Sequence, residues 1–442
     1  MYSTDDLEKI RQQFNVLPYP NIPLDKSPKE DYESLFIHNV VTPHYLHFRK
    51  VPDPQNMLIL DAGCGSGYKS LILAEANPGA TIVGVDLSEE SVKLAKVRLD
   101  YYGFNDAQFH AMPIEEVSSL GLQFDYINCD EVLYLVPNPP LVLESLRAVL
   151  KPHGILRTNL HSAAQRGAYY RAQELFRMMG LMDHAPDDAE IKVATQTMQA
   201  LKPEVIARMQ SWQDRFATPD GKSDILANLL LLGDKGFTVP QAVELLDAAG
   251  LEFVRMVAWR RWEVADLFEQ PDDLPDFWAL VLGQASPLQR AMILELMHPV
   301  NRLIDFWCVG QEAIALAGTP VDDWSEEQWS RAMVHLHPQI KTEKAKQGLI
   351  EAVRAKRDFE ISSYIPLPAF GPVYLDGAIA AALLPLWDGP QSIHTLAERY
   401  RVLHPVNPIT LEALTSEEAF AVVQDTLNRL DAFLYVLLET EE

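Results

Sequence analysis

The sequence of 442 residues contains little cysteine, with Cys64, Cys129 and Cys308 as its only three. Three cysteines cannot build the disulfide framework of a small secreted domain, and no Cys-x-x-Cys pair suggests a zinc site. The amino terminus also lacks the basic and apolar segments of a secretion signal. We therefore expect a soluble protein of a reducing compartment, the cytoplasm, without a bound metal.

Basic residues are scarce as well, because 37 Lys and Arg residues stand against 62 Asp and Glu residues, which gives a formal net charge of −25. Affinity for nucleic acid depends largely on basic contacts to phosphate, so this balance argues against DNA or RNA as the main partner. No apolar run approaches the roughly 20 residues that cross a bilayer, and we expect no membrane span. The length and the 48% hydrophobic composition instead indicate a globular protein of roughly two to four domains.

Strand and helix patterns alternate in the first third of the chain. Residues 57–60 form an apolar run that ends at a glycine-rich turn, residues 68–76 have helical spacing, and residues 81–85 form a second apolar run. A strand, a helix and a strand within about 30 residues make a βαβ unit with parallel strands. Further strands are expected at residues 107–111, 124–129 and 155–160. The pattern predicts an α/β fold with a Rossmann-like doubly wound sheet.

Two features follow the first two of these strands, where a doubly wound sheet binds its ligand. One is the turn at residues 61–67, Asp-Ala-Gly-Cys-Gly-Ser-Gly, whose glycines let the backbone approach a ligand closely. The other is Asp86, whose carboxylate can accept hydrogen bonds from two ribose hydroxyls. Tyr68 stands where a dinucleotide fingerprint would have its last glycine. The features predict a site for an adenosine cofactor, the alternative being a tight turn in some other Rossmann-like protein.

Residues 57–160 resemble the class I S-adenosylmethionine-dependent methyltransferases, whose first motif has the pattern E/D-x-G-x-G-x-G. The resemblance implies S-adenosyl-L-methionine as the cofactor, with its methionine part at the glycine turn and its ribose at Asp86. Pro113 stands where the family often has an Asp that bonds the adenine, so Ile114 or Glu115 is expected to replace it. The cofactor-binding residues expected from the resemblance are Asp61, Gly63, Cys64, Gly65, Gly67, Asp86, Leu87, Ile114, Glu115 and Cys129.

The methyl acceptor is expected at the loops after the fourth and fifth strands. Methyl transfer from a sulfonium needs an aligned acceptor in a desolvated site, and often the removal of one proton. Asp130 and Tyr134 follow the fourth strand and His161 ends the fifth, so these three are the catalytic candidates. His161 can act as a base near neutral pH, unless it is a strand-end histidine bonded to the backbone. Asp130 can equally serve to shape the methionine pocket. The residues expected to bind the acceptor or form a lid are Tyr19, Glu131 and Asn159.

The pattern of helices and strands divides the whole chain into units. The expected units are an N-terminal helical arm (1–50), the methyltransferase core (51–161), a helical insertion (162–235), a return to the sheet (236–268), a helical middle domain (269–365) and a winged-helix-like domain (366–442). The insertion would hang over the carboxyl edge of the sheet as a lid or acceptor platform, unless it only covers apolar surface. The tryptophans of the middle domain, Trp307 among them, are expected to be packing anchors rather than an acceptor groove.

This order of units is similar to methyltransferases that carry a helical regulatory region and a C-terminal winged-helix-like unit, among them protein-lysine methyltransferases of outer-membrane proteins. Residues 14–20 look like their Tyr-Asp-x-x-Pro-Tyr-Pro segment, although Phe14 replaces the tyrosine. Residues 157–161 lie where they have an Asn-Thr motif, without the Pro-Gly-Trp expected after Asn159. The resemblance implies a protein side chain, such as lysine, as the acceptor. The alternatives are a small metabolite or a regulatory protein that binds the cofactor without catalysis, and the oligomeric state is left open.

Overall fold

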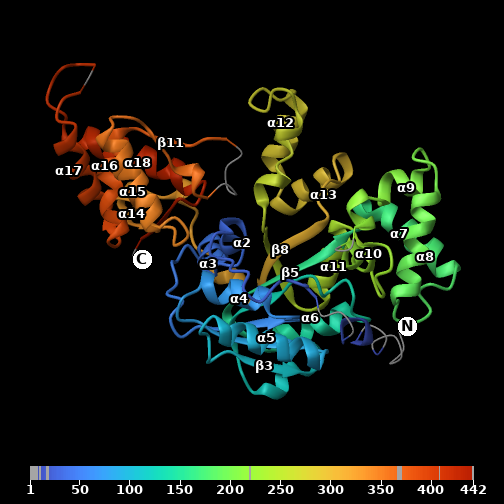
Figure 1. The fold of residues 1–442 in the computed structure, drawn as a ribbon. Coiled ribbons are helices and arrows are strands. Elements are labelled where there is room, and N and C mark those ends of the chain that lie inside the picture. The colour runs from blue at the N-terminus through green and yellow to red at the C-terminus, as the bar shows by residue number, and fades with distance from the viewer. Residues whose placement is uncertain are drawn as a thin grey trace.

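The computed structural model describes residues 8, 11–15, 19–218, 221–365, 371–407 and 409–440. Within these residues lies an eight-stranded sheet of order β3-β2-β1-β4-β5-β8-β7, with the short β6 paired to the end of β5 (Figure 1). Its strands are β1 (Leu58–Ala62), β2 (Thr81–Asp86), β3 (Gln108–Ala111), β4 (Phe124–Cys129), β5 (Leu150–Ser162), β6 (Gly236–Phe237), β7 (Leu251–Met256) and β8 (Leu303–Gly310). Neighbours among β1 to β5 run parallel, whereas β8 runs antiparallel to β5 and β7. The predicted α/β fold with a Rossmann-like sheet is confirmed.

Apolar side chains cover both faces of this sheet, because successive residues of a strand point to opposite sides. Leu60 and Ile127 pack with residues of α6 and α11, whereas Ile59 and Tyr126 pack with residues of α4. The helices beside these strands are α4 (Tyr68–Ala76), α5 (Glu89–Tyr101), α6 (Pro139–Ala148) and α11 (Val239–Ala248). Since both faces are covered, the ends of the strands are where a ligand can bind.

The segment between β5 and β6 is helical, as its sequence pattern predicts, and is drawn in green at the right of Figure 1. Its helices are α7 (Ala163–Met178), α8 (Asp188–Ala200), α9 (Ile206–Ser211) and α10 (Lys222–Asn228). Their apolar sides form a separate core that includes Phe176, Met198 and Phe216. We call this segment the insertion; its role as a lid or an acceptor platform stays a prediction.

The segment from residue 269 to 365 is less helical than expected. It contains α12 (Asp276–Gln284), which projects at the top of Figure 1, and α13 (Pro287–Met297), but also β8 and β9 (Met333–Leu336). The prediction of a helical domain is wrong at both strands, because β8 inserts between β5 and β7. Trp307 is a packing residue as expected, but it lies fully buried in the main sheet. A short apolar run interrupted only by Asp305 fits a buried helix as well as a strand, which explains the error.

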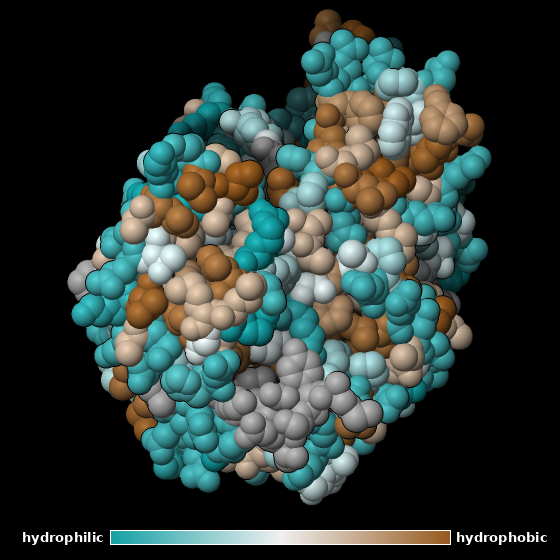
Figure 2. Space-filling model, turned by 90° about the vertical axis from the view of Figure 1, so that its right-hand side faces the viewer, coloured by the Kyte–Doolittle hydropathy of each residue, from teal (hydrophilic) through white to brown (hydrophobic). Residues whose placement is uncertain are grey.

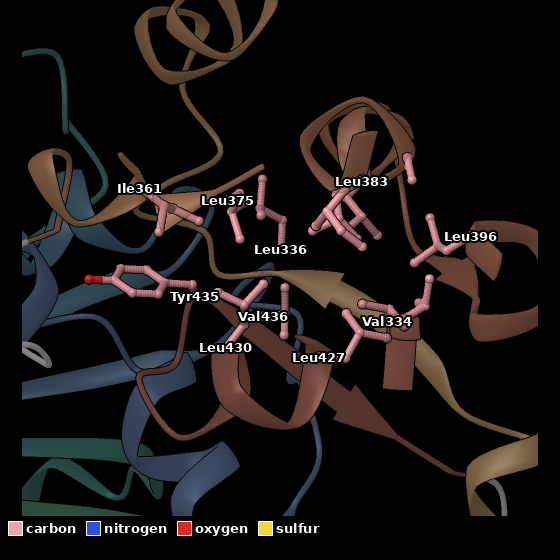
Figure 3. Close-up of a cluster of buried hydrophobic side chains, with 14 of the residues drawn as sticks. Val334, Leu336, Ile361, Leu375, Leu383, Leu396, Leu427, Leu430, Tyr435 and Val436 are labelled. Atoms are coloured by element: carbon pink, nitrogen blue, oxygen red, sulfur yellow. The ribbon is translucent and has the colours of Figure 1, made fainter. Parts of the chain in front are cut away.

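The C-terminal unit begins before residue 366, the expected boundary, because β9 is the middle strand of its sheet. This antiparallel sheet has the order β12-β9-β13. The elements of the unit are α14 (Glu326–Ser330), α15 (Glu343–Arg354), β10 (Phe359–Glu360), β11 (Tyr374–Leu375), α16 (Gly377–Leu383), β12 (Gln391–Ser392), α17 (Ile393–Leu403), α18 (Ser416–Asp431) and β13 (Val436–Glu439). Figure 3 shows Leu336, Leu427 and Val436 in their common core. The likeness to a winged helix stays a prediction.

An N-terminal segment connects the main sheet to the C-terminal unit. Its helices are α2 (Tyr32–Ile37) and α3 (Val41–Phe48). Phe36 and Tyr45 belong to the core of the C-terminal unit, and the Tyr45 hydroxyl donates a hydrogen bond to the carboxylate of Asp431. On the other side, the Asn39 amide donates to the carbonyl of Ala76 in α4 over 2.7 Å. This segment is therefore packed between the two parts.

Two kinds of feature are not found among the described residues. No helix there combines the length and the apolar composition that crossing a bilayer requires. No group of three or more His, Cys, Asp or Glu side chains in the described ranges could hold a metal ion. The three cysteines are free and buried.

Candidate functional site

The glycine-rich turn between β1 and α4 has a backbone that favours glycine. Gly63, Gly65 and Gly67 have φ angles of 81°, 50° and 80°, in the left-handed region that side chains disfavour. A Cβ on Gly65 would lie only 2.2 Å from the carbonyl oxygen of Tyr19. The N–H groups of Gly63 and Cys64 both donate to the carbonyl of Val85, over 2.8 and 3.0 Å. The turn is thus fixed to the end of β2 and leaves no space for a side chain at any of the three glycines.

Asp86 lies at the end of β2 and faces this turn. Its Oδ2 accepts the N–H of Gly65 over 2.9 Å and its Oδ1 accepts the N–H of Ser88 over 2.8 Å. Burial raises the pKa of Asp86, while these two hydrogen bonds act in the opposite direction. Each carboxylate oxygen can accept a second hydrogen bond. The side chain is therefore held rigidly and still has capacity for ligand hydroxyls.

A cavity lies against the turn and Asp86, and we call it the turn cavity. The predicted residues that line it are Tyr19, Gly63, Gly65, Asp86, Leu87, Ile114, Glu115, Asp130 and Glu131. The lining residues that were not predicted as site residues are Arg11, Phe14, Ser88, Ser91, Val132, Leu135 and Val136. Segments far apart in the sequence therefore meet at the ends of β1, β2 and β4.

Other predicted cofactor residues lie behind the turn cavity and do not line it. Asp61 is buried, and its carboxylate accepts hydrogen bonds from Ser70 (2.6 Å) and Asn128 (2.9 Å), which ties β1 to α4 and β4. Burial raises the pKa of Asp61 to about 6. Burial also raises the pKa of Cys129 to about 12, so this thiol stays protonated. The predicted residues in this position are Asp61, Cys64, Gly67 and Cys129, and their contacts give them a supporting role.

Residues 19–23 cross the outside of the glycine turn, and we call them the strap. The N–H of Ser66 donates to the carbonyl of Tyr19 over 3.0 Å, and the Ser66 hydroxyl donates to the carbonyl of Pro20 over 2.7 Å. Arg98 of α5 donates to the carbonyls of Ile22 (2.7 Å), Pro23 (3.0 Å) and Ser66 (3.1 Å). One buried guanidinium thus fixes the strap to the turn, and Tyr19 to the wall of the turn cavity.

Asp130 follows β4 and lies in a cluster of buried charges. The ammonium of Lys69 is 2.8 Å and the guanidinium of Arg157 3.6 Å from its Oδ2, while the Asn159 amide donates to its Oδ1. Burial by itself would raise the pKa of Asp130, but Arg157 and Lys69 outweigh it and hold the pKa well below its usual range. Asp130 is thus a fixed anion in the wall of the turn cavity and a poor proton acceptor.

A second cavity adjoins the first beneath the insertion, and we call it the insertion cavity. Phe14, Tyr19, Glu131 and Leu135 line both cavities. The remaining lining residues are Gln13, Tyr134, His161, Arg215, Ser223, Asp224, Leu226, Ala227, Asn228, Leu231 and Arg302. The insertion therefore contributes one wall of a space that continues from the turn cavity.

His161 ends β5 in the wall of the insertion cavity. Its Nδ1 lies 2.7 Å from the buried carboxylate of Asp234, and Arg302 donates to its Nε2 over 3.1 Å. Because an arginine can only donate, Nε2 must be the acceptor and Nδ1 carries the proton. The ring of Tyr134 stacks on the imidazole with 3.6 Å between centroids. Burial lowers the pKa of His161 to about 4, so the ring is neutral at physiological pH.

Glu131 stands at the boundary between the two cavities. Its φ of 61° is rare for a residue with a side chain, and its N–H donates to the Asn159 side chain over 2.8 Å. Its carboxylate forms an ion pair with Arg302. Burial raises the pKa of Tyr134 well above its ordinary value, so that phenol keeps its proton. Of the three catalytic candidates, only His161 therefore presents a neutral proton-accepting atom.

Several site residues were missed by the sequence analysis. Asp234 pairs with His161 from a distant part of the chain, and Arg302 directly precedes β8, the strand that was not predicted. Arg215 and Asp224 pair with each other over 2.6 Å inside the insertion cavity. Neither the spacing of these residues nor a motif connects them in the sequence. A prediction that included β8 as the neighbour of β5 would have placed Arg302 near His161.

Residues 53–218 match the family model of a methyltransferase domain. An uncharacterized protein of Synechococcus is 23% identical over 340 residues, which cover 75% of this chain and 76% of that protein. The ubiquinone biosynthesis O-methyltransferase of Bordetella avium is 37% identical over 101 residues, 23% of this chain. The match spans only 41% of that enzyme.

Among solved structures, PKMT2 from Rickettsia typhi in complex with AdoHcy superposes with a TM-score of 0.57. The superposition covers 92% of this chain and 76% of that chain at 17% sequence identity. At this identity the likeness establishes the fold. It extends beyond the eight-stranded sheet, since it takes in nearly all of the 442 residues.

Proposed function

We propose that the chain, whose residues 53–218 match a methyltransferase domain, is a class I S-adenosylmethionine-dependent methyltransferase with S-adenosyl-L-methionine as its cofactor, and that its acceptor is an amine of a protein side chain, such as that of lysine. Three features support this acceptor: the way the two cavities join, the charge at their boundary, and the surface of the insertion. The acidic sequence argues against nucleic acid as a partner. Three free, buried thiols suit a reducing compartment, which we propose to be the cytoplasm.

The turn cavity fits the cofactor. The turn has no Cβ atoms at Gly63 and Gly65, where a Cβ would be 2.2 Å from a neighbouring atom. Asp86 has capacity for the ribose hydroxyls, and the apolar side chains of Leu87 and Ile114 can enclose the adenine. When bound there, S-adenosyl-L-methionine supplies a methyl group on a positively charged sulfur.

The observation that carries the proposal is that the two cavities share the wall formed by Phe14, Tyr19, Glu131 and Leu135. An acceptor that enters the insertion cavity therefore meets the cofactor site beside a carboxylate and two aromatic rings. A carboxylate and ring faces attract a cationic amine head and exclude water from its alkyl stem. The net charge of −25 further favours the approach of a basic segment.

An amine must lose its proton before it can attack a methyl group. His161 offers a neutral Nε2 in the insertion cavity, and its Nδ1 proton is held by Asp234 over 2.7 Å. Asp234 is itself held by the guanidinium of Arg166 over 3.0 Å, so the imidazole orientation is fixed. Because its lowered pKa makes His161 a weak base, we assign to its Nε2 the orientation of the amine through a hydrogen bond, and to Glu131 the attraction of the ammonium group.

The surface around the insertion supports a protein as the acceptor. The insertion exposes apolar side chains, among them Met178, Ile206 and Met209. The face of the molecule seen in Figure 2 is hydrophilic with several hydrophobic patches. Exposed apolar surface near a site is typical of contacts with another protein.

Incubation of a cell lysate with the full chain and methyl-labelled cofactor tests this proposal. Label is expected in one or a few protein bands, and mass spectrometry of these bands should place it on a lysine amine. The Gly65→Ala variant is the negative control, and Gly250→Ala, at a left-handed glycine with open space around it, is the matched control. Label confined to small compounds, or no label, would refute the proposal.

A second candidate is methylation of a hydroxyl on a small molecule. The buried Asp234–His161 pair favours it, because a carboxylate that holds a histidine is also an arrangement that removes a hydroxyl proton. Label in the small-molecule extract of the same experiment would support this candidate. A complete absence of transfer, with the cofactor bound, would instead support a regulatory protein.

A further inference from the structure

Arg302 bridges two acceptor groups in the wall of the insertion cavity. Its Nη2 pairs with the carboxylate of Glu131, and its Nη1 donates to Nε2 of His161 over 3.1 Å. Both partners belong to the wall to which we assign the acceptor head. The guanidinium of Arg302 therefore contacts the same two groups, Glu131 and His161, that we propose for the cationic head of the acceptor.

The side chain of Arg302 is free to leave while its backbone stays in place. Its carbonyl accepts the N–H of Ser162 over 2.9 Å, which fixes the chain at the start of β8. The side chain itself is 47% exposed, whereas that of Glu131 is only 18% exposed. An arginine that moves to water is readily solvated, but the half-enclosed carboxylate left behind then lacks its charge partner.

The other cations near this place already have partners of their own. Arg166 pairs with Asp234 over 3.0 Å, behind His161. Arg215, which lines the same cavity, pairs with Asp224 over 2.6 Å. A new cation is therefore the group that can replace Arg302 and keep Glu131 paired.

We propose that Arg302 occupies the place of the acceptor's cationic head in the enzyme without acceptor, and that displacement of Arg302 selects cationic amines over neutral and anionic compounds. The inference rests on the proposed amine acceptor and names the residue that discriminates for it. If Arg302 stays in place, it occupies the space that a neutral compound would need. If Arg302 moves out, a neutral compound leaves the carboxylate of Glu131 without a charge partner, so both cases oppose binding.

Binding of a small probe to the full chain saturated with S-adenosylhomocysteine tests the proposal without any methyl transfer. The probe is n-butylammonium, and n-butanol is its neutral counterpart of similar size. We expect the Arg302→Met variant to bind n-butylammonium at least tenfold more tightly than the wild type, and to bind n-butanol no better. Isothermal titration calorimetry measures both affinities, and thermal melting verifies that the variant is folded.

Two further variants separate a specific site from a general change of charge. Arg147→Met removes one positive charge at a surface pair with Glu312 outside both cavities, and its affinity for n-butylammonium should stay within twofold of the wild type. The double variant Glu131→Gln, Arg302→Met should lose the gained affinity. Equal affinity in wild type and Arg302→Met, or an equal gain in Arg147→Met, would overturn the proposal.

The probe experiment and the labelling experiment can fail independently. Label on a lysine amine together with unchanged probe binding would overturn the role of Arg302 and leave the amine acceptor standing. Label only on small hydroxyl compounds would overturn the amine acceptor. The proposed role of Arg302 in selecting cationic acceptors would then also be refuted.

Discussion

The turn cavity and the insertion cavity share a wall but are built in different ways. In the turn cavity, the glycine turn and Asp86, to which we assign the cofactor, come from one short stretch of the chain between the start of β1 and the end of β2. In the insertion cavity, side chains such as His161, Arg215 and Arg302 come from distant segments and are held by one another's charges. A site formed by backbone geometry can bind the same ligand in many proteins, because it depends little on individual side chains. A site formed by paired side chains can be specific to one acceptor, because each pair can differ between proteins.

The largest expected effect breaks the turn cavity alone. In Gly65→Ala, the new Cβ would lie 2.2 Å from the Tyr19 carbonyl at a φ of 50°. An overpacked contact costs roughly 1–3 kcal/mol and a left-handed alanine roughly 1 kcal/mol more, so a turn that shifts to relieve this strain should bind S-adenosylhomocysteine at least about 30-fold more weakly. Calorimetry measures this change.

The matched control for Gly65 is Gly250, between α11 and β7. Its φ is 68°, but nothing lies within 4 Å of an added Cβ. Gly250→Ala should lower stability by roughly 1 kcal/mol and leave cofactor affinity unchanged. Equal cofactor affinity in both variants would show that the contact with the strap is irrelevant to the cofactor.

A somewhat smaller effect is expected from Asp86→Ala. The variant removes the charged acceptor of the Gly65 and Ser88 N–H groups and the proposed ribose partner. Cofactor binding should weaken by about 1–3 kcal/mol, through lost charge-assisted hydrogen bonds. The affinity of n-butylammonium for the insertion cavity should not change, and unchanged cofactor affinity would contradict the ribose assignment.

The two cavities should respond in opposite ways to acid. The pKa of His161 is lowered to about 4 by burial, so the unfolded chain binds a proton below about pH 6.5 that the folded chain does not. Stability from His161 is therefore complete above pH 6.5 and is lost as the pH falls toward 4. The pKa of Asp86 is raised by burial, so acid favours the folded state there.

Comparison of the wild type with His161→Gln isolates this effect, because glutamine can still donate to Asp234 and accept from Arg302. Between pH 7 and pH 5, the free energy of unfolding of the wild type should fall by about 2 kcal/mol more than that of the variant. Urea unfolding at the two pH values measures the difference. Parallel losses in both proteins would mean that His161 titrates normally in the folded chain.

The smallest expected effect concerns the strap. Arg98→Met removes three hydrogen bonds to backbone carbonyls of the strap and the turn, while the two bonds from Ser66 remain. Release of S-adenosylhomocysteine should become about tenfold faster, as expected for the loss of hydrogen bonds from a charged donor. Arg147→Met, at a surface pair with Glu312 outside both cavities, is the control. A release rate equal to that of the control would assign Arg98 to stability alone.

The sequence permits prediction of the turn cavity because its residues follow a local pattern. Gly63, Gly65 and Asp86 stand at the ends of strands whose apolar runs are evident, and parallel strands bring their carboxyl ends together. The same logic identifies His161 at the end of β5. The same logic predicts that Asp61 binds the cofactor because it directly precedes the turn. In the structure its carboxylate instead accepts hydrogen bonds from Ser70 and Asn128 behind the cavity.

The rest depends on contacts that no local pattern reveals. β8 was not predicted because its apolar run has the length of a buried helix segment, and with it Arg302 was lost from the site. The pairing of Asp234 with His161 depends on the path of the insertion. The charge state of Asp130 depends on Lys69 and Arg157, which only the folded chain brings to it.

The segment of α2 and α3 has a consequence for any shortened form of the protein. Phe36 and Tyr45, although they lie near the amino terminus in sequence, share a core with the C-terminal unit. Removal of that unit would therefore expose both side chains to water. His38 lies between the two helices, with its Nε2 2.9 Å from Nη1 of Arg157 and 3.7 Å from Oδ2 of Asp130. Asp130 is part of the wall of the turn cavity. Deletion of the C-terminal unit should therefore disturb the wall of the turn cavity, and the eight-stranded sheet is not expected to function as an independent domain.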